Sequence, residues 1–334
     1  MSKAGIVGVT GYAGIELFRL LNQHSKAEVT HCFSRNKSIS DFNDVYPFVE
    51  SGSVELKSFD PLIDYPIDVL FLATPHAQSH SWMKDLVNRS YKIIDLSADF
   101  RISESLFNDF YGCKHEYPEG IDMFVRGFSE IYREQLKNTS YCANPGCFST
   151  AVVLGSFPLS KTELGCVNML VDAKSGVSGK GKKVDESSLY CEVNESTMSY
   201  GTFGHRHTPE MELELNCPVL FSPHLVPMNR GIMASIYCDN PSKITQDDLS
   251  NIYSSFYKDE PFVRVVGPDR PIKTHYVTGS NTCLIKPMVL KNKIVIFSVL
   301  DNVIKGASGQ AIQNLNIMFG LEETLGLSQL PIFP

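Results

Sequence analysis

The N-terminal stretch places a glycine-rich turn between an apolar run and an amphipathic run. Residues 4–9 have the apolar character of a buried parallel strand, and residues 14–21 place apolar side chains three and four positions apart, as a helix does. Between them, Gly8, Gly11 and Gly14 follow the pattern G-x-x-G-x-x-G. In dinucleotide-binding units such glycines let a pyrophosphate approach the backbone at a helix N-terminus. A purely structural turn is the alternative, but the order favours an α/β fold that binds a cofactor.

The end of the next expected strand indicates which cofactor. Residues 27–33 read as a strand, and the next five residues, 34–38, include Ser34, Arg35 and Ser38 but no acid. An NAD enzyme usually places Asp or Glu there for the ribose hydroxyls, whereas hydroxyls and cations suit a 2′-phosphate. The sequence therefore favours NADP, with a solvated polar loop as the alternative.

Two more strand-like runs, residues 67–73 and 92–96, precede Thr74-Pro75-His76 and Ser97-Ala98-Asp99-Phe100-Arg101. Ligands of open α/β sheets gather at the carboxyl ends of the strands. Arg101 is placed to bind an anionic group there, although a surface salt bridge explains it equally well.

The amino-acid composition limits the classes of binding partner that we expect. The 334 residues include 30 Lys and Arg against 37 Asp and Glu, a formal charge of −7, which gives no reason to expect nucleic acid or an anionic membrane. No apolar stretch approaches the roughly 20 residues that span a bilayer, so we expect a cytoplasmic protein with a small-molecule substrate. The nine cysteines include no C-x-x-C pair, so their spacing indicates neither a disulfide framework nor a zinc knuckle.

Cys147 follows a Pro145-Gly146 turn and precedes the apolar run 151–157, which suits a buried helix. A thiol at a helix N-terminus meets backbone N–H groups and the positive end of the dipole, which lower its pKa from about 8.5. The hypothesis is a nucleophile; the alternative is a buried cysteine that acts as a small hydrophobe.

After Cys147 the alternating pattern gives way to strand-rich stretches, with one helix near 246–257. This favours an α+β second domain on a mostly antiparallel sheet, with a last helix over 309–318 that returns to the first domain. We therefore expect a Rossmann NADP-binding domain from residues 1–146 and 306–334, and a catalytic and oligomerisation domain from 147–305. The strand-rich stretches are 166–174, 219–227, 232–238 and 293–301.

A cysteine nucleophile needs a proton partner, and His205, His207 and Glu210 form a dense cluster. A metal site at H-x-H and a solvated charged turn are the alternatives. Together with Cys147 and a nicotinamide cofactor, the cluster implies hydride transfer to or from a thioester.

Six separated motifs resemble those of the N-acetyl-γ-glutamyl-phosphate reductases of arginine biosynthesis, in their longer form, within the semialdehyde dehydrogenase superfamily. The resemblance runs over nearly the whole chain. The motifs are Gly8–Gly14, Asp95–Arg101, Asn144–Cys147, His205–Glu210, Pro223–Pro227 and Gly306–Gln310.

The resemblance implies NADPH-dependent reduction of N-acetylglutamyl phosphate to the semialdehyde, with release of phosphate. Cys147 matches the nucleophile, and His205 matches the acid/base in preference to His207. It assigns Arg101, Ser178, His207 and Glu210 to the substrate. It assigns to the cofactor Gly8, Thr10, Gly11, Tyr12, Ala13, Gly14, Ser34, Arg35, Ser38, Ala73, Pro75, His76, Ser97, Ser175, Gly176 and Asn302.

The chain departs from the family pattern where Lys180-Gly181-Lys182 replaces Ala-Gly-Arg and where Gly127-Phe128-Ser129-Glu130 replaces Gly-Leu-Pro-Glu. The nearest alternatives are reductases of aspartyl phosphate or of carrier-linked aminoadipyl or glutamyl phosphate. More remote alternatives are a non-redox thiol hydrolase or acyltransferase and a catalytically silent NADP-binding sensor. An open sheet in the second domain favours a homodimer or homotetramer.

Overall fold

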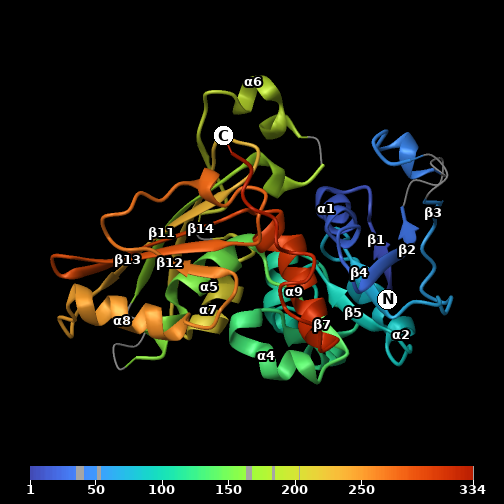
Figure 1. Ribbon diagram of the computed structural model, residues 1–334, viewed down its shortest axis with the longest axis horizontal. Helices are drawn as coiled ribbons and strands as arrows, with labels where there is room; N and C mark the ends of the chain where they lie inside the picture. The colour runs from blue at the N-terminus through green and yellow to red at the C-terminus, as the bar shows by residue number, and fades with distance from the viewer. Residues whose placement is uncertain (35–40, 51–53, 163–167, 183–184, 203, 334) are drawn as a thin grey trace. The chain divides into compact units, whose positions relative to one another are not determined.

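The chain folds into two compact units, shown in the computed structural model of Figure 1, which describes residues 1–34, 41–50, 54–162, 168–182, 185–202 and 204–333. The first unit comprises residues 1–145 and 307–328, and the second comprises 146–306 and 329–334. The central boundaries lie one residue from those expected. The last residues group with the second unit instead of the first, where the N–H of Ile332 donates to the carbonyl of Thr278 (2.8 Å).

The first unit contains a seven-stranded, wholly parallel sheet in the order β3-β2-β1-β4-β5-β7-β6. The strand order reverses beside β1, between β2 and β4, which is where open α/β sheets bind ligands. Its strands are β1 Ser2–Val7, β2 Ala27–Phe33, β3 Leu56–Lys57, β4 Val69–Leu72, β5 Lys92–Asp95, β6 Val125–Arg126 and β7 Tyr141–Ala143.

The described part of this unit contains five α-helices, and α9 is the most deeply buried, because all ten of its residues are buried. It contacts α1, α4 and β5, so the C-terminal helix returns to the first unit as expected. Its amide side chains satisfy backbone groups, since Gln310 and Asn314 both donate to the carbonyl of Gly127 (2.9 Å each). The helices are α1 Tyr12–Leu21, α2 Met83–Leu86, α3 Glu104–Tyr111, α4 Ser129–Lys137 and α9 Gly309–Met318.

The second unit contains a seven-stranded mixed sheet in the order β12-β13-β14-β11-β8-β10-β9. Two pairs, β8 with β10 and β12 with β13, are parallel, and the others are antiparallel, so the expected mostly antiparallel sheet is confirmed. Its strands are β8 Met169–Ser175, β9 Met198–Ser199, β10 Val219–Leu225, β11 Ile232–Asp239, β12 Val263–Val265, β13 Cys283–Leu290 and β14 Lys293–Leu300.

Helices α5 Cys147–Ser160, α7 Thr208–Leu215 and α8 Gln246–Phe256 pack on one face of this sheet (Figure 1). The opposite face carries Leu220, Leu170 and Tyr237, which are cross-strand neighbours and 45%, 42% and 37% exposed. A sheet face with three large apolar side chains in a row is a surface suited to burial against another molecule.

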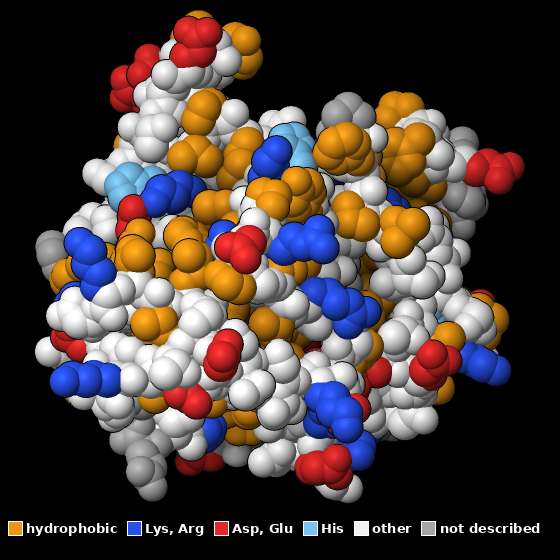
Figure 2. Space-filling view, turned by 60° about the vertical axis from the view of Figure 1, so that its left-hand side comes forward, with side chains coloured by type: hydrophobic (Ala, Val, Ile, Leu, Met, Phe, Trp, Pro, Cys, Tyr) orange, Lys and Arg blue, Asp and Glu red, His pale blue; other side chains and the backbone are white. Residues whose placement is uncertain are grey.

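The segment around α6 (Tyr190–Val193) projects from the second unit, and Figure 2 shows acidic and hydrophobic side chains together at a projecting tip. Cys217 is disulfide-bonded, which the cysteine spacing did not indicate.

Among the described residues, no helix combines the length and apolar character needed to cross a membrane. The short helical turns are η1 Phe42–Asp44, η2 Ser79–Ser81, η3 Pro118–Met123, η4 Val177–Lys180, η5 Glu186–Ser188, η6 Thr274–Tyr276 and the π-helical η7 Ile304–Ser308.

Candidate active site

The glycine turn of the first unit needs its glycines for steric reasons. Gly8 has φ +83°, and a Cβ there would lie 2.3 Å from the carbonyl oxygen of Ala73. A Cβ on Gly14 would lie 2.2 Å from the carbonyl oxygen of Gly8. Gly11 is the N-cap of α1, and the first turn of α1 contains no acidic residue. The turn therefore brings bare backbone and a helix N-terminus to the switch point of the sheet, which suits a pyrophosphate.

The other residues assigned to the cofactor in this unit follow strand ends. Ala73 follows β4 and adjoins Gly8, while Pro75 is exposed and His76 accepts a hydrogen bond at Nδ1 from the N–H of Ala98 (3.1 Å). Ser34 follows β2 and is mostly buried. Arg35 and Ser38 lie outside the described residues.

Ser97 belongs to a buried cluster of hydroxyls and carboxyls. The Oγ of Ser79 lies 2.7 Å from Asp95 Oδ2, 2.9 Å from Ser97 Oγ and 3.0 Å from Asp99 Oδ2. Asp99 also accepts from the N–H groups of residues 77, 78 and 80, which holds the turn after His76. Burial and the neighbouring Asp99 raise the pKa of Asp95 to about 7. Because Ser97 is only 1% exposed, this cluster supports the loop from the protein interior.

Arg101 is also turned inward. It is 6% exposed, and one Nη donates to the carbonyl oxygen of Leu96 (2.7 Å). The guanidinium thus stabilises the loop after β5.

Cys147 is the first residue of α5, with Gly146 as the N-cap in an extended conformation. The expected helix therefore begins at the cysteine itself, four residues earlier than the apolar run. The first turn contains no acidic residue, so the amides of the helix start act on the thiol without a competing carboxylate from that turn.

His205 lies close to the start of α5 in an aromatic setting. Its ring centroid is 5.5 Å from that of Phe148, 5.2 Å from that of Phe221 and 4.9 Å from that of His207. Burial, with a smaller contribution from Arg206, lowers the pKa of His205 to about 4. Its Nδ1 accepts from the backbone N–H of His207 (3.1 Å). The neutral ring then has its hydrogen on Nε2, which makes Nε2 a hydrogen-bond donor.

His207 and Glu210 both face the N-cap of α5. A Cβ on Gly146 would lie 2.4 Å from Nε2 of His207, so the imidazole packs directly on the glycine. Glu210 is in the first turn of α7, and its Oε2 accepts from the N–H of Gly146 (3.0 Å). This carboxylate is 4% exposed, so it holds the turn before Cys147.

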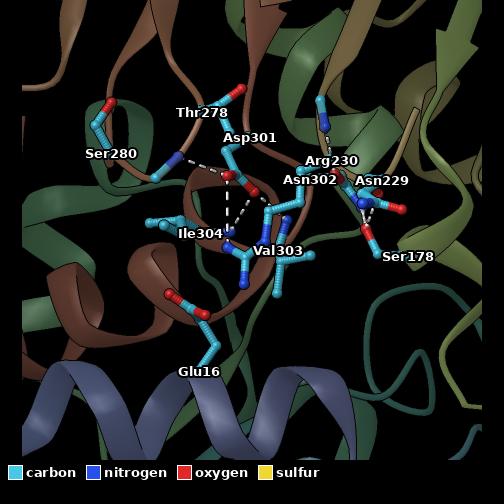
Figure 3. A network of polar contacts seen from close by, with 12 residues as sticks. Glu16, Ser178, Asn229, Arg230, Thr278, Ser280, Asp301, Asn302, Val303 and Ile304 are labelled. Carbon is cyan, nitrogen blue, oxygen red and sulfur yellow. Dashed lines mark hydrogen bonds and ion pairs between the residues drawn. The ribbon is translucent and has the colours of Figure 1, made fainter. Parts of the chain in front are cut away.

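The remaining assigned residues lie at the ends of β8 and β14 (Figure 3). The Nδ2 of Asn302 donates to Ser178 Oγ (2.9 Å), and its Oδ1 accepts from the N–H of Gly231 (2.7 Å). Ser178 Oγ in turn donates to the carbonyl of Asn229 (2.6 Å). Ser175 and Gly176 are buried just before, and a Cβ on Gly176 would lie 2.7 Å from that same carbonyl oxygen.

The structure adds Tyr200, which the sequence analysis did not single out. Its ring lies 5.6 Å from that of His205, and burial together with the nearby Cys147 raises the pKa of its phenol. Tyr200 stands in a polar stretch without periodicity, so no signal in the sequence marks it. In the second unit the structure thus groups Cys147, His205, His207, Glu210 and Tyr200. Within the described ranges, no group of three His, Cys, Asp or Glu side chains has the arrangement of a metal site.

Two family models match the chain and between them cover most of it. Residues 3–139 match "Semialdehyde dehydrogenase, NAD binding domain", and residues 147–302 match "Semialdehyde dehydrogenase, dimerisation domain".

Relatives similar over the full chain include the N-acetyl-gamma-glutamyl-phosphate reductases of Dehalococcoides mccartyi, 38% identical, and Halothermothrix orenii, 41% identical. The first match covers 99% of both chains and the second covers 100% of both. Among solved structures, aspartate semialdehyde dehydrogenase II of Vibrio cholerae, complexed with ASA, superposes with a TM-score of 0.73 at 15% identity, covering 96% of this chain and 98% of that one. The last likeness shows the fold alone.

Proposed function

The chain belongs to the semialdehyde dehydrogenase family, with N-acetyl-gamma-glutamyl-phosphate reductases as full-length relatives, and from this premise we propose that it reduces N-acetylglutamyl 5-phosphate to the 5-semialdehyde. The observation that carries the proposal is Cys147 at the first position of α5, beside a histidine pair and a tyrosine. The reaction is a step of arginine biosynthesis in the cytoplasm.

The reaction begins at Cys147. Its thiolate attacks the acyl carbon, and the carbonyl electrons move onto oxygen, so that a tetrahedral intermediate forms on Sγ. When the carbonyl re-forms, the bond to the phosphate oxygen breaks and phosphate leaves with its electron pair. The amides at the start of α5 stabilise first the thiolate and then the oxyanion.

A thioester on Cys147 remains, and it is the species that is reduced. The nicotinamide cofactor, when bound, supplies a hydride to the thioester carbon. His205 donates a hydrogen bond from Nε2 to the oxygen that gains charge, since its Nδ1 is engaged by His207. The resulting thiohemiacetal oxyanion then collapses: its electron pair re-forms the carbonyl, the C–S bond breaks, the aldehyde leaves, and the sulfur regains its electron pair as the thiolate.

The first unit supports a nicotinamide dinucleotide through the steric cradle of Gly8 and Gly14. We assign NADPH because residues 34–38, directly after β2, include Ser34, Arg35 and Ser38 and no acid. Tyr12 and Ala13 are at the start of α1, where their backbone amides suit the pyrophosphate.

The test is the reverse reaction, which requires cofactor, phosphate and aldehyde together. Purified protein given NADP, phosphate and N-acetylglutamate semialdehyde should produce NADPH absorbance at 340 nm only when phosphate is present. Cys147→Ala should abolish the signal, while Cys191→Ala, at an exposed cysteine outside the cluster, should keep it. A phosphate-dependent signal with aspartate semialdehyde alone would move the assignment to the aspartyl phosphate reductases. A signal without phosphate would contradict the acyl-phosphate step.

The open face of the second sheet supports a homo-oligomer. Leu220, Leu170 and Tyr237 form a row on this face, and on the same strands the Nδ1 of His224 lies 3.1 Å from Oδ1 of Asp172. We assign this face to contact with a second copy, consistent with the matched dimerisation domain. Leu170→Asp should shift the mass measured by light scattering towards the monomer, and an unchanged mass would contradict the assignment.

A further inference from the structure

A buried carboxylate in the second unit holds the turn that packs against Cys147. Asp301 follows β14 and is completely buried. Its Oδ1 accepts from the N–H groups of Val303 (2.8 Å) and Ile304 (3.2 Å), and its Oδ2 accepts from the N–H of Gly279 (2.8 Å). Figure 3 shows these bonds converging on the carboxylate, with Arg230 Nη1 3.6 Å from Oδ2 as the nearby positive charge. A buried carboxylate with three N–H donors and a cation is fully compensated.

The same residue fixes Gly306 through its backbone. The carbonyl of Asp301 accepts from the N–H of Gly306 (2.9 Å), which closes the π-helical turn. Gly306 meets the nucleophile directly, since a Cβ on it would lie 2.8 Å from Cβ and 3.2 Å from Cα of Cys147. The side chain and the carbonyl of Asp301 thus fix the 303–306 turn, and this turn packs against Cys147, the first residue of α5.

We propose that Asp301 is a positioning residue for the thiol: by fixing the 303–306 turn, it sets where Cys147 Sγ lies relative to the amides at the start of α5. The proposal rests on Cys147 being the nucleophile. No reacting atom touches Asp301, and its effect passes through Gly306. A shift of about 1 Å at a reacting group can cost about 10²-fold in rate, so a displacement of the 303–306 turn should lower the turnover rate.

Thiol reactivity tests the proposal without substrate. In Asp301→Asn one amide oxygen still accepts from Val303, but the new NH2 group faces the N–H of Gly279 and cannot accept from it. The rate of Cys147 alkylation by iodoacetamide is measured between pH 6 and 10, with the site identified by peptide mass spectrometry. We expect the alkylation rate at pH 7 to fall about tenfold, equivalent to about one unit in the pKa of the thiol.

The direction of the change separates positioning from charge. Loss of a nearby negative charge, acting only through space, lowers the pKa of a thiol and speeds alkylation. A displaced thiol loses helix amides and reacts more slowly. Faster or unchanged alkylation in Asp301→Asn would therefore overturn the proposal. In turnover, kcat should fall about tenfold or more while KM changes less than threefold, because binding groups stay in place.

Two variants complete the experiment. Asp239→Asn makes the same chemical change at an exposed ion pair with Lys293, at the opposite end of β14, and should react and turn over like wild type. Gly306→Ala inserts the methyl group against Cys147 without changing any charge and should slow alkylation in the same direction. If Asp301→Asn does not fold, an unchanged alkylation rate in Gly306→Ala refutes the proposal. If wild type itself fails the reverse reaction, the proposed function fails; if wild type turns over and the variants match it, only this inference fails.

Discussion

Protonation of His205 should destabilise the second unit between pH 6.5 and 4. The perturbation is a shift from pH 7 to pH 5, compared in wild type and His205→Asn. The ring has an ordinary pKa of 6.5 and a pKa of about 4 in the fold, mainly through burial. Because the folded pKa is the lower one, the fold favours the neutral ring. The contribution of His205 to the free energy of unfolding is fully present above pH 6.5, declines as the pH falls towards 4, and stays constant at lower pH.

The magnitude follows from the two pKa values. With 6.5 unfolded and about 4 folded, the free energy of unfolding falls by about 2 kcal/mol between pH 7 and pH 5 on account of this residue. Other groups titrate in the same interval, so the informative quantity is the double difference between wild type and His205→Asn.

Urea unfolding at both pH values, followed by circular dichroism, gives this double difference. The single tryptophan, Trp82, belongs to the first unit, so its fluorescence is not the probe to choose. His275→Asn, at an exposed position, serves as the control for loss of an imidazole as such. A double difference below about 0.5 kcal/mol, or an NMR titration of His205 near its ordinary pKa, would refute the buried, neutral imidazole.

Three further outcomes test other parts of the site. Gly146→Ala adds a Cβ 2.4 Å from Nε2 of His207 and should lower kcat by about 10²-fold; activity within twofold of wild type would contradict the packing. Burial raises the pKa of Asp95 to about 7, so wild type should lose stability as the pH rises from about 4 to 7, because the buried carboxyl ionises. Asp95→Asn has no such carboxyl and should keep that stability. If urea unfolding gives the same change in stability between pH 5 and pH 7 for wild type and variant, the expectation is wrong. Arg35→Asp should raise KM for NADPH far more than for NADH, and equal effects would exclude 2′-phosphate recognition.

Local patterns in the sequence determined the elements and their order. Gly8 and Gly14 identify the turn before α1, because at both positions only a residue without Cβ fits. The glycines themselves can be read directly from the sequence. Periodicity likewise predicts β2 and α9 with the bounds the structure has. The change of pattern after Cys147 predicts the second sheet, since strand and helix periods are properties of neighbouring residues.

Contacts between distant residues were decided only by the tertiary structure. The family resemblance assigns Glu210 to the substrate, and only the structure shows that its carboxylate accepts from the N–H of Gly146, 64 positions away. Asp301 precedes Asn302, which the family resemblance marks, but nothing in its neighbours indicates that it holds the turn against Cys147. Such pairings depend on how strands and helices pack, which spacing along the chain does not record. The sequence by itself thus determined the chemistry available to this protein, while the packing of the second unit decided which side chains surround the thiol and in which protonation state.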